Sequence, residues 1–82
     1  MSEQDRLRWR CRRGTRELDL MLMRYLDHEY SQASPAERAA FARLLECTDP
    51  SLQEIFLGVQ AAPDPDMESV ARKIRSGTSS RD

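Results

Sequence analysis

Apolar side chains recur along the chain at the spacing of amphipathic helices. The clearest segment runs from Thr15 to Tyr30, where the i, i+3, i+4, i+7, i+8 pattern is followed by Leu18, Met21, Leu22, Tyr25 and Leu26. No segment alternates apolar and polar residues between turn signals, as a half-buried strand does. The pattern therefore predicts an all-α protein, a compact bundle of about five short helices with short connections.

The starts of two further helices are marked by capping residues. Ser34-Pro35-Ala36-Glu37 is a capping box, in which the Ser34 hydroxyl accepts an N–H of the first turn and Glu37 reaches back to the Ser34 amide. The apolar face of this helix is formed by Ala40, Phe41, Leu44 and Leu45. Asp49-Pro50 predicts a second cap. The inner face of the helix that follows holds Leu52, Ile55, Phe56 and Val59.

The two ends of the chain complete the predicted bundle. Leu7 and Cys11 share one side of a first helix, with Arg12 and Arg13 in its last turn and Gly14 at its end. Two prolines make residues 61–66 a turn. A last helix then carries Met67, Val70, Ala71 and Ile74 and ends near Gly77. We expect one domain over residues 1–77 and a flexible C-terminal tail over 78–82.

Length and charge limit the classes of function. Eighty-two residues, 39% of them apolar, build one small domain with a thin core, which favours a binding module over an enzyme with a deep pocket. The net charge of −1 is unevenly spread, with six arginines against two acids in residues 1–16 and eleven acids against three arginines in residues 17–68. This segregation either favours oriented encounter with a charged partner or reflects an ordinary solvated helical surface.

Several kinds of site are disfavoured by what the sequence lacks. No apolar run approaches the ~18 residues of a membrane span, so we expect no membrane insertion. Cys11 and Cys47 have no His or Cys cluster nearby, so both are expected as reduced, buried thiols without a metal. The acidic central helices and the absence of a phosphate-binding loop argue against nucleic acid and nucleotide. Glu3 and Asp5 argue against a transit peptide, which leaves a cytoplasmic location.

The segment from Trp9 to Asp19 carries the candidate binding residues. Gly14 either caps a helix or removes a side chain so that another protein's backbone approaches closely, with Arg13 as a bidentate donor and Glu17 as a carboxylate beside it. Trp9 either packs into the bundle, the commoner fate of tryptophan, or stands among arginines as an interface anchor. His28 is expected at the surface or a helix end, without a catalytic role.

Four short motifs follow one another in an order that is specific as a set. Arg13-Gly14-Thr15-Arg16-Glu17 matches an RGxxE signature, His28-Glu29-Tyr30 and the capping box follow, and residues 44–52 read LLECTDPSL. In these motifs, which lie within residues 7–58, the chain resembles the SdhE flavinylation factors, also called succinate dehydrogenase assembly factors. The family segment that corresponds to residues 44–52 is LLExxDPDL. Residues 55–58 depart from the family's frequent WLxG segment, although their apolar character preserves a core role.

The resemblance implies an assembly factor, not an enzyme. Such a protein binds the flavoprotein subunit of succinate dehydrogenase, or of the related fumarate reductase, and promotes covalent attachment of FAD to a histidine of that subunit. It would hold no stably bound cofactor of its own, and we expect a monomer when free. Arg13, Gly14 and Glu17 match the signature and would form the partner-binding surface. Arg12 and Trp9 are added as neighbours from the arginine-rich segment alone.

Two other classes of function stay open at the level of sequence. The same family has been labelled an antitoxin of a toxin–antitoxin pair, which would make the chain an inhibitory binding protein. A direct flavin carrier is the other alternative, although no dinucleotide-binding fingerprint supports it.

Overall fold

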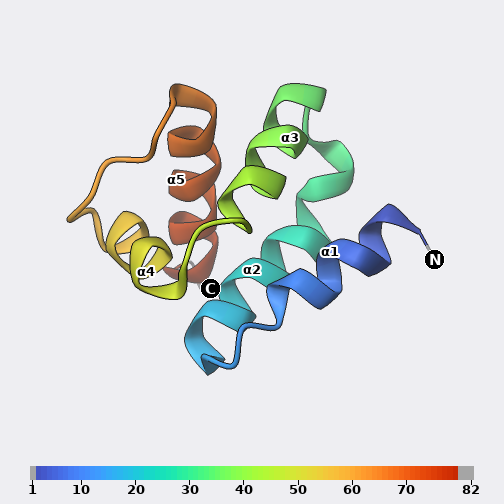
Figure 1. The fold of residues 1–82 in the computed structure, drawn as a ribbon. Helices are drawn as coiled ribbons and strands as arrows, with labels where there is room; N and C mark the ends of the chain where they lie inside the picture. Colours follow the sequence, from blue (N-terminus) through green and yellow to red (C-terminus); the bar gives the residue numbers. More distant parts are fainter. Residues whose placement is uncertain (1, 80–82) are drawn as a thin grey trace.

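The computed structural model describes residues 2–79, which form helices joined by short connections and contain no strand. The elements follow in the order α1 (Glu3–Cys11), α2 (Arg16–His28), the short 3-10 helix η1 (Tyr30–Gln32), α3 (Pro35–Leu44), α4 (Asp49–Leu57) and α5 (Pro65–Ser79) (Figure 1). The radius of gyration is 11.6 Å, close to the roughly 12 Å expected of a folded chain of this length. The predicted all-α bundle of short helices is confirmed.

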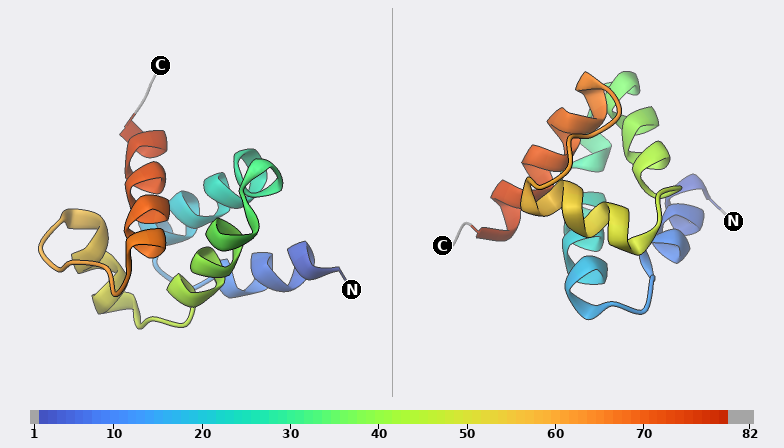
Figure 2. Two further views of the ribbon diagram at one scale, coloured as in Figure 1. Left: turned by 90° about the horizontal axis from the view of Figure 1, so that it is seen from above. Right: turned by 60° about the vertical axis from the view of Figure 1, so that its left-hand side comes forward.

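Helix α5 contacts more of the bundle than any other element. It packs against α3, α2 and α4, while α1 packs along α2. Figure 1 shows α3 and α5 side by side, and the right-hand view of Figure 2 shows α4 crossing α5.

The core is built from the predicted apolar faces. The buried residues include Leu7, Cys11, Leu18, Leu22, Tyr25, Leu26, Ala40, Phe41, Leu44, Leu45, Leu52, Ile55, Phe56, Met67, Val70, Ala71 and Ile74. Met21 is only partly buried. The prediction of Val59 for the inner face of α4 is wrong, because α4 ends at Leu57 and Gly58 adopts a φ of 83° that turns the chain away.

The predicted caps are confirmed in part. The Ser34 hydroxyl accepts the N–H of Glu37 at 3.2 Å, whereas the Glu37 carboxylate accepts from Nζ of Lys73 at 2.6 Å and so joins α3 to α5. The prediction of Asp49 as the cap of α4 is wrong by one residue. Thr48 is the N-cap, with its Oγ1 accepting the N–H of Ser51 at 3.3 Å. The Asp49 carboxylate is thereby left for another contact.

The outer helices end at other residues than predicted. Helix α1 ends at Cys11, so Arg12 and Arg13 lie beyond its last turn and Gly14 is a loop residue. Helix α5 continues past Gly77 through Ser79 and so includes two residues of the predicted tail; residues 80–82 lie outside the described part of the chain.

Two expected absences concern membranes and metals. No helix within residues 2–79 has both the length and the apolar character needed to cross a membrane. In the same residues, no three His, Cys, Asp or Glu side chains gather as metal ligands. Cys11 is a buried free thiol, and Cys47 is free but half-buried instead of buried.

Phe41→Ala is expected to lower the free energy of unfolding by about 3–5 kcal/mol, because the ring is fully buried. Its centroid lies 4.8 Å from that of Tyr25 and 5.7 Å from that of Tyr30, so truncation also removes two aromatic contacts. Urea denaturation measures the loss. Leu20→Ala, at an exposed position of α2, is the control, with an expected change within about 0.5 kcal/mol. Equal losses would contradict this account of the core.

The stability of the fold is expected to fall at alkaline pH. Burial raises the pKa of the Cys11 thiol from 9.0 to about 11 and, chiefly by the same cause, that of Tyr25 from 10.0 to about 12. Above pH 9 the unfolded thiol loses its proton while the folded one keeps it. The free energy of unfolding therefore falls between pH 9 and 11, by at most about 1.4 kcal/mol per pH unit from Cys11.

Urea denaturation of the wild type and Cys11→Ala from pH 7 to 10.5 measures this dependence. The variant should be less stable at pH 7 but lose less stability per pH unit above pH 9. Parallel curves would contradict a buried neutral thiol.

Candidate functional site

Arg13 ties the α1–α2 connection to the α3–α4 connection. Its Nε donates to Oδ1 of Asp49 at 2.6 Å and its Nη1 to the carbonyl oxygen of Leu45 at 2.7 Å, while Nη2 donates to the carbonyl oxygen of Cys47. The Arg13 side chain is 13% exposed, and charge-assisted bonds are stronger in such a partly desolvated setting. The guanidinium predicted to receive a partner is thus engaged within the chain itself.

The backbone of Arg13 is fixed as well. Its N–H donates to Oδ1 of Asp19 at 2.7 Å. Asp19 lies in the first turn of α2, so this bond joins the loop to the start of the helix that follows. With its side chain and its backbone both held, Arg13 sets the position of Gly14, the next residue.

Gly14 is exposed and has a left-handed backbone. Its φ is 90°, and a Cβ built on it would meet no atom within 4 Å. The conformation, not crowding inside the chain, therefore favours glycine here, and an L side chain would cost on the order of 1 kcal/mol. The same geometry leaves bare backbone open to the approach of another molecule.

Glu17 lies in the first turn of α2 with its carboxylate exposed. Within residues 2–79, no hydrogen bond or ion pair engages this carboxylate. Glu17 lines a groove of about 450 Å³ between α2, α4 and α5; the other lining residues are Leu18, Met21, Gln53, Phe56, Leu57 and Arg75. The carboxylate is thus free to accept hydrogen bonds from a partner at the edge of an apolar groove.

Trp9 is not packed into the bundle. Its side chain is 66% exposed, because Leu7 and Cys11 occupy the inner side of α1. The Arg12 guanidinium carbon lies 6.0 Å from the Trp9 ring centroid, within the range of a cation–π contact. The interpretation of Trp9 as a core residue is wrong, whereas the expected neighbourhood of Trp9 and Arg12 is confirmed.

The five predicted partner-binding residues thus fall into three settings. Gly14 and Glu17 are exposed, Arg13 faces the α3–α4 connection, and Trp9 and Arg12 form an exposed pair at the end of α1. His28, the exposed last residue of α2, lies at a helix end as expected.

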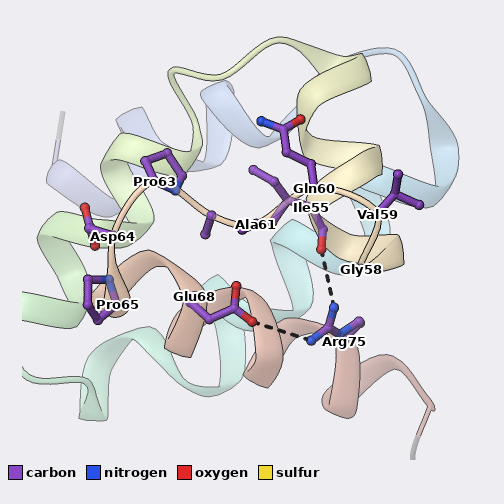
Figure 3. A pocket seen from close by; sticks show the side chains of 11 residues that line it. Ile55, Gly58, Val59, Gln60, Ala61, Pro63, Asp64, Pro65, Glu68 and Arg75 are labelled. Carbon is purple, nitrogen blue, oxygen red and sulfur yellow. Dashed lines mark hydrogen bonds and ion pairs between the residues drawn. The ribbon is translucent and has the colours of Figure 1, made fainter.

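A second hollow lies beside α4. This open depression has a volume of about 810 Å³ and lies between the end of that helix, residues 58–65 and α5 (Figure 3). Nη1 of Arg75 donates to the carbonyl oxygens of Ile55 and Phe56, each at 3.3 Å, and so satisfies carbonyls at the end of α4. Arg75 also lines the groove beside Glu17. It therefore fixes the end of α4 between the two hollows.

Asp19 and Asp49 are partners of Arg13 that no sequence motif predicts. Asp-Pro at a helix start is a common N-cap pattern, and it predicts Asp49 as a cap instead of a partner of Arg13. Thr48, the residue before it, is also a favoured N-cap type, and its presence is the one sequence signal that leaves the Asp49 carboxylate available for another contact. The groove residues Gln53 and Leu57 carry no motif, and only the packing of α4 near α2 reveals them.

The chain is similar to the members of one protein family over most of its length. Residues 5–78 match the family described as flavinator of succinate dehydrogenase. A protein named FAD assembly factor SdhE from Shewanella oneidensis is 40% identical over 70 residues, which cover 85% of each chain. The proteins of the same name from Xylella fastidiosa strain 9a5c and Methylococcus capsulatus are 43% and 41% identical. These alignments cover 92% and 93% of this chain and 77% and 92% of the relatives.

Arg13→Ala is expected to lower the free energy of unfolding by about 2–3 kcal/mol, because Asp49 and two carbonyls lose a charged donor. Arg12→Ala is the matched control and removes only an exposed cation–π contact, worth at most about 1 kcal/mol. Urea denaturation of both variants measures the difference. If Arg12→Ala is as damaging as Arg13→Ala, the contacts of Arg13 do not hold the two connections together.

Proposed function

The chain belongs to the family of flavinators of succinate dehydrogenase, and we propose that it is an assembly factor for covalent FAD. In this proposal it binds the flavoprotein subunit of succinate dehydrogenase and promotes attachment of FAD to that subunit. The observation that carries the proposal is the family match over residues 5–78, which includes the whole segment from Arg13 to Glu17. The names of the aligned relatives, each an FAD assembly factor, support the same role.

Gly14 and Glu17 are proposed as the centre of the docking surface. Gly14 offers exposed backbone with no side chain in the way, and Glu17 offers a carboxylate without an internal partner. Arg13 is a positioning residue in this account, since its guanidinium is engaged with the α3–α4 connection. Trp9 and Arg12 extend the surface onto α1, where an exposed aromatic ring beside a cation resembles an interface hot spot.

The mechanism we propose is a shift of population within the partner. The bond forms between the flavin and a histidine of the flavoprotein, so this chain contributes neither reacting atom. By binding only the arrangement in which flavin and histidine are close, the chain raises the fraction of flavoprotein that can react. Its differential affinity for that arrangement sets the size of the effect. The chain then acts as a chaperone-like factor instead of an enzyme and holds no cofactor stably.

The finer features of the role remain predictions. The flavoprotein of the related fumarate reductase is a second expected partner, and the free chain is expected to be a monomer in the cytoplasm. We expect no binding to nucleic acid, because acidic residues dominate the middle of the chain.

The proposal is tested by the covalent flavin on the host's succinate dehydrogenase flavoprotein. In-gel fluorescence after denaturation detects it in cells with the gene, without it, and with the gene restored. The proposal expects fluorescence to be lost on deletion and recovered on restoration, at equal amounts of flavoprotein. Undiminished fluorescence in the deletion strain would contradict it and would favour the antitoxin alternative.

Gly14→Arg is expected to abolish docking and covalent flavin while the bundle stays folded, because the new side chain projects from an exposed loop. Gly14→Ala is the matched control, with the same backbone strain of about 1 kcal/mol but little bulk. Thermal unfolding and pull-down of the flavoprotein separate the two effects. Similar melting of both variants with loss of binding only in Gly14→Arg is the expected result. Equal loss of binding in both would mean that Gly14 acts through the fold alone.

A further inference from the structure

The groove beside Glu17 has an apolar floor and an exposed apolar wall. Leu18 and Phe56 on its floor are nearly fully buried, whereas Leu57 at its edge is 77% exposed. Met21 lies one turn of α2 beyond Glu17, on the same face of the helix, and completes the apolar lining. Covering Leu57 and Met21 with a partner would remove apolar surface from water at little cost, because the groove already exists.

The charge at the edge of the groove is negative. Glu17 has no ion pair within residues 2–79. Arg75 is the other charged lining residue. Its Nη1 already donates to the Ile55 and Phe56 carbonyl oxygens at the end of α4, and its Nη2 lies 4.0 Å from Oε2 of Glu68. Figure 3 shows the contacts of Arg75 with Ile55 and Glu68 from the side of the neighbouring hollow. The charge left for a partner is therefore that of Glu17, and the complementary group is basic.

The polar groups lie at the edges of the groove, not across its floor. Small-molecule sites enclose most of their ligand and aim several polar groups at it. Here Glu17, Gln53 and Arg75 border an apolar surface formed by Leu18, Met21, Phe56 and Leu57. This arrangement fits a protruding apolar side chain of a protein with a cationic neighbour. The groove also continues directly from Glu17, the residue that the proposed docking surface depends on.

We propose that this groove between α2, α4 and α5 is the second half of the docking surface and receives an apolar segment of the flavoprotein subunit with a basic residue beside it. The basic residue pairs with Glu17, and the apolar side chain lies against Leu57 and Met21. This inference rests on the proposed function and adds the element of the partner that the chain recognises. It also assigns to Leu57 a role in binding that no sequence motif indicates.

The test is the dissociation constant for the purified flavoprotein subunit, produced in cells that lack this chain. Leu57→Ser changes the exposed edge of the groove. Val59→Ser is a matched control, because Val59 is 75% exposed, lies two residues further on and lines the other hollow. We expect Leu57→Ser to raise Kd at least about tenfold and Val59→Ser to leave it within about twofold. Circular dichroism should show both variants folded, since both side chains are exposed.

Two further variants test the sign of the partner's charge. Glu17→Gln removes the carboxylate charge, and Glu17→Arg reverses it. With a basic partner residue, Glu17→Arg should bind several times more weakly than Glu17→Gln, because like charges then face each other. If Glu17→Arg binds the flavoprotein as tightly as Glu17→Gln, or more tightly, the partner residue that faces Glu17 is not basic and the inference is overturned.

The remaining outcomes separate this inference from the proposed function. If Leu57→Ser and Val59→Ser bind alike while Gly14→Arg fails to bind, the assembly role stands and the groove is not used. If the wild type does not bind the flavoprotein, both are overturned. If Leu57→Ser instead abolishes self-association of the chain, the occupant of the groove is a second copy. If it abolishes the quenching of free FAD fluorescence by the chain, the occupant is a flavin. Either result overturns the inference.

Discussion

The contacts of Arg13 hold together two parts of the chain that are more than thirty residues apart in sequence. Three donors of one guanidinium reach Asp49 and the carbonyls of Leu45 and Cys47, and the backbone N–H of Arg13 reaches Asp19. A loop of four residues is thereby given a fixed shape at the surface of a small domain. The exposure of Gly14 and the position of Glu17 both follow from that shape. A thin hydrophobic core alone would not fix a loop in this way.

The three residues of the RGxxE signature therefore have different surroundings. The arginine bonds to other parts of the chain, the glycine supplies a left-handed turn with no side chain, and the glutamate side chain is exposed to solvent. With these contacts, one short motif supports the fold and also supplies residues of the proposed docking surface. These contacts also mean that loss of binding in an Arg13 variant is ambiguous, since the variant disturbs the loop before any partner arrives. Glu17 and Leu57, both exposed, report on binding without that ambiguity.

The helices and the core could be predicted from the sequence because the apolar spacing of each helix agrees with its burial. Phe41, Leu22 and Ile74 are examples of residues assigned correctly from period alone. Errors occurred where two local signals competed, as with Thr48 and Asp49 at one cap, or where a turn ended a helix early, as before Val59. The inward direction of Arg13, the exposure of Trp9 and the groove near Leu57 depend on how distant elements pack. Local pattern carries little information about such contacts.

In the proposed complex, one continuous surface, from the loop at Gly14 to the groove between α2, α4 and α5, meets the flavoprotein. Amide hydrogen exchange of the chain, alone and mixed with the purified flavoprotein subunit, locates that surface. We expect slower exchange in the complex at residues 14–17 and around Leu57, with little change in α3. Slowing confined to α3 and η1, or no slowing at residues 14–17, would contradict the proposed complex.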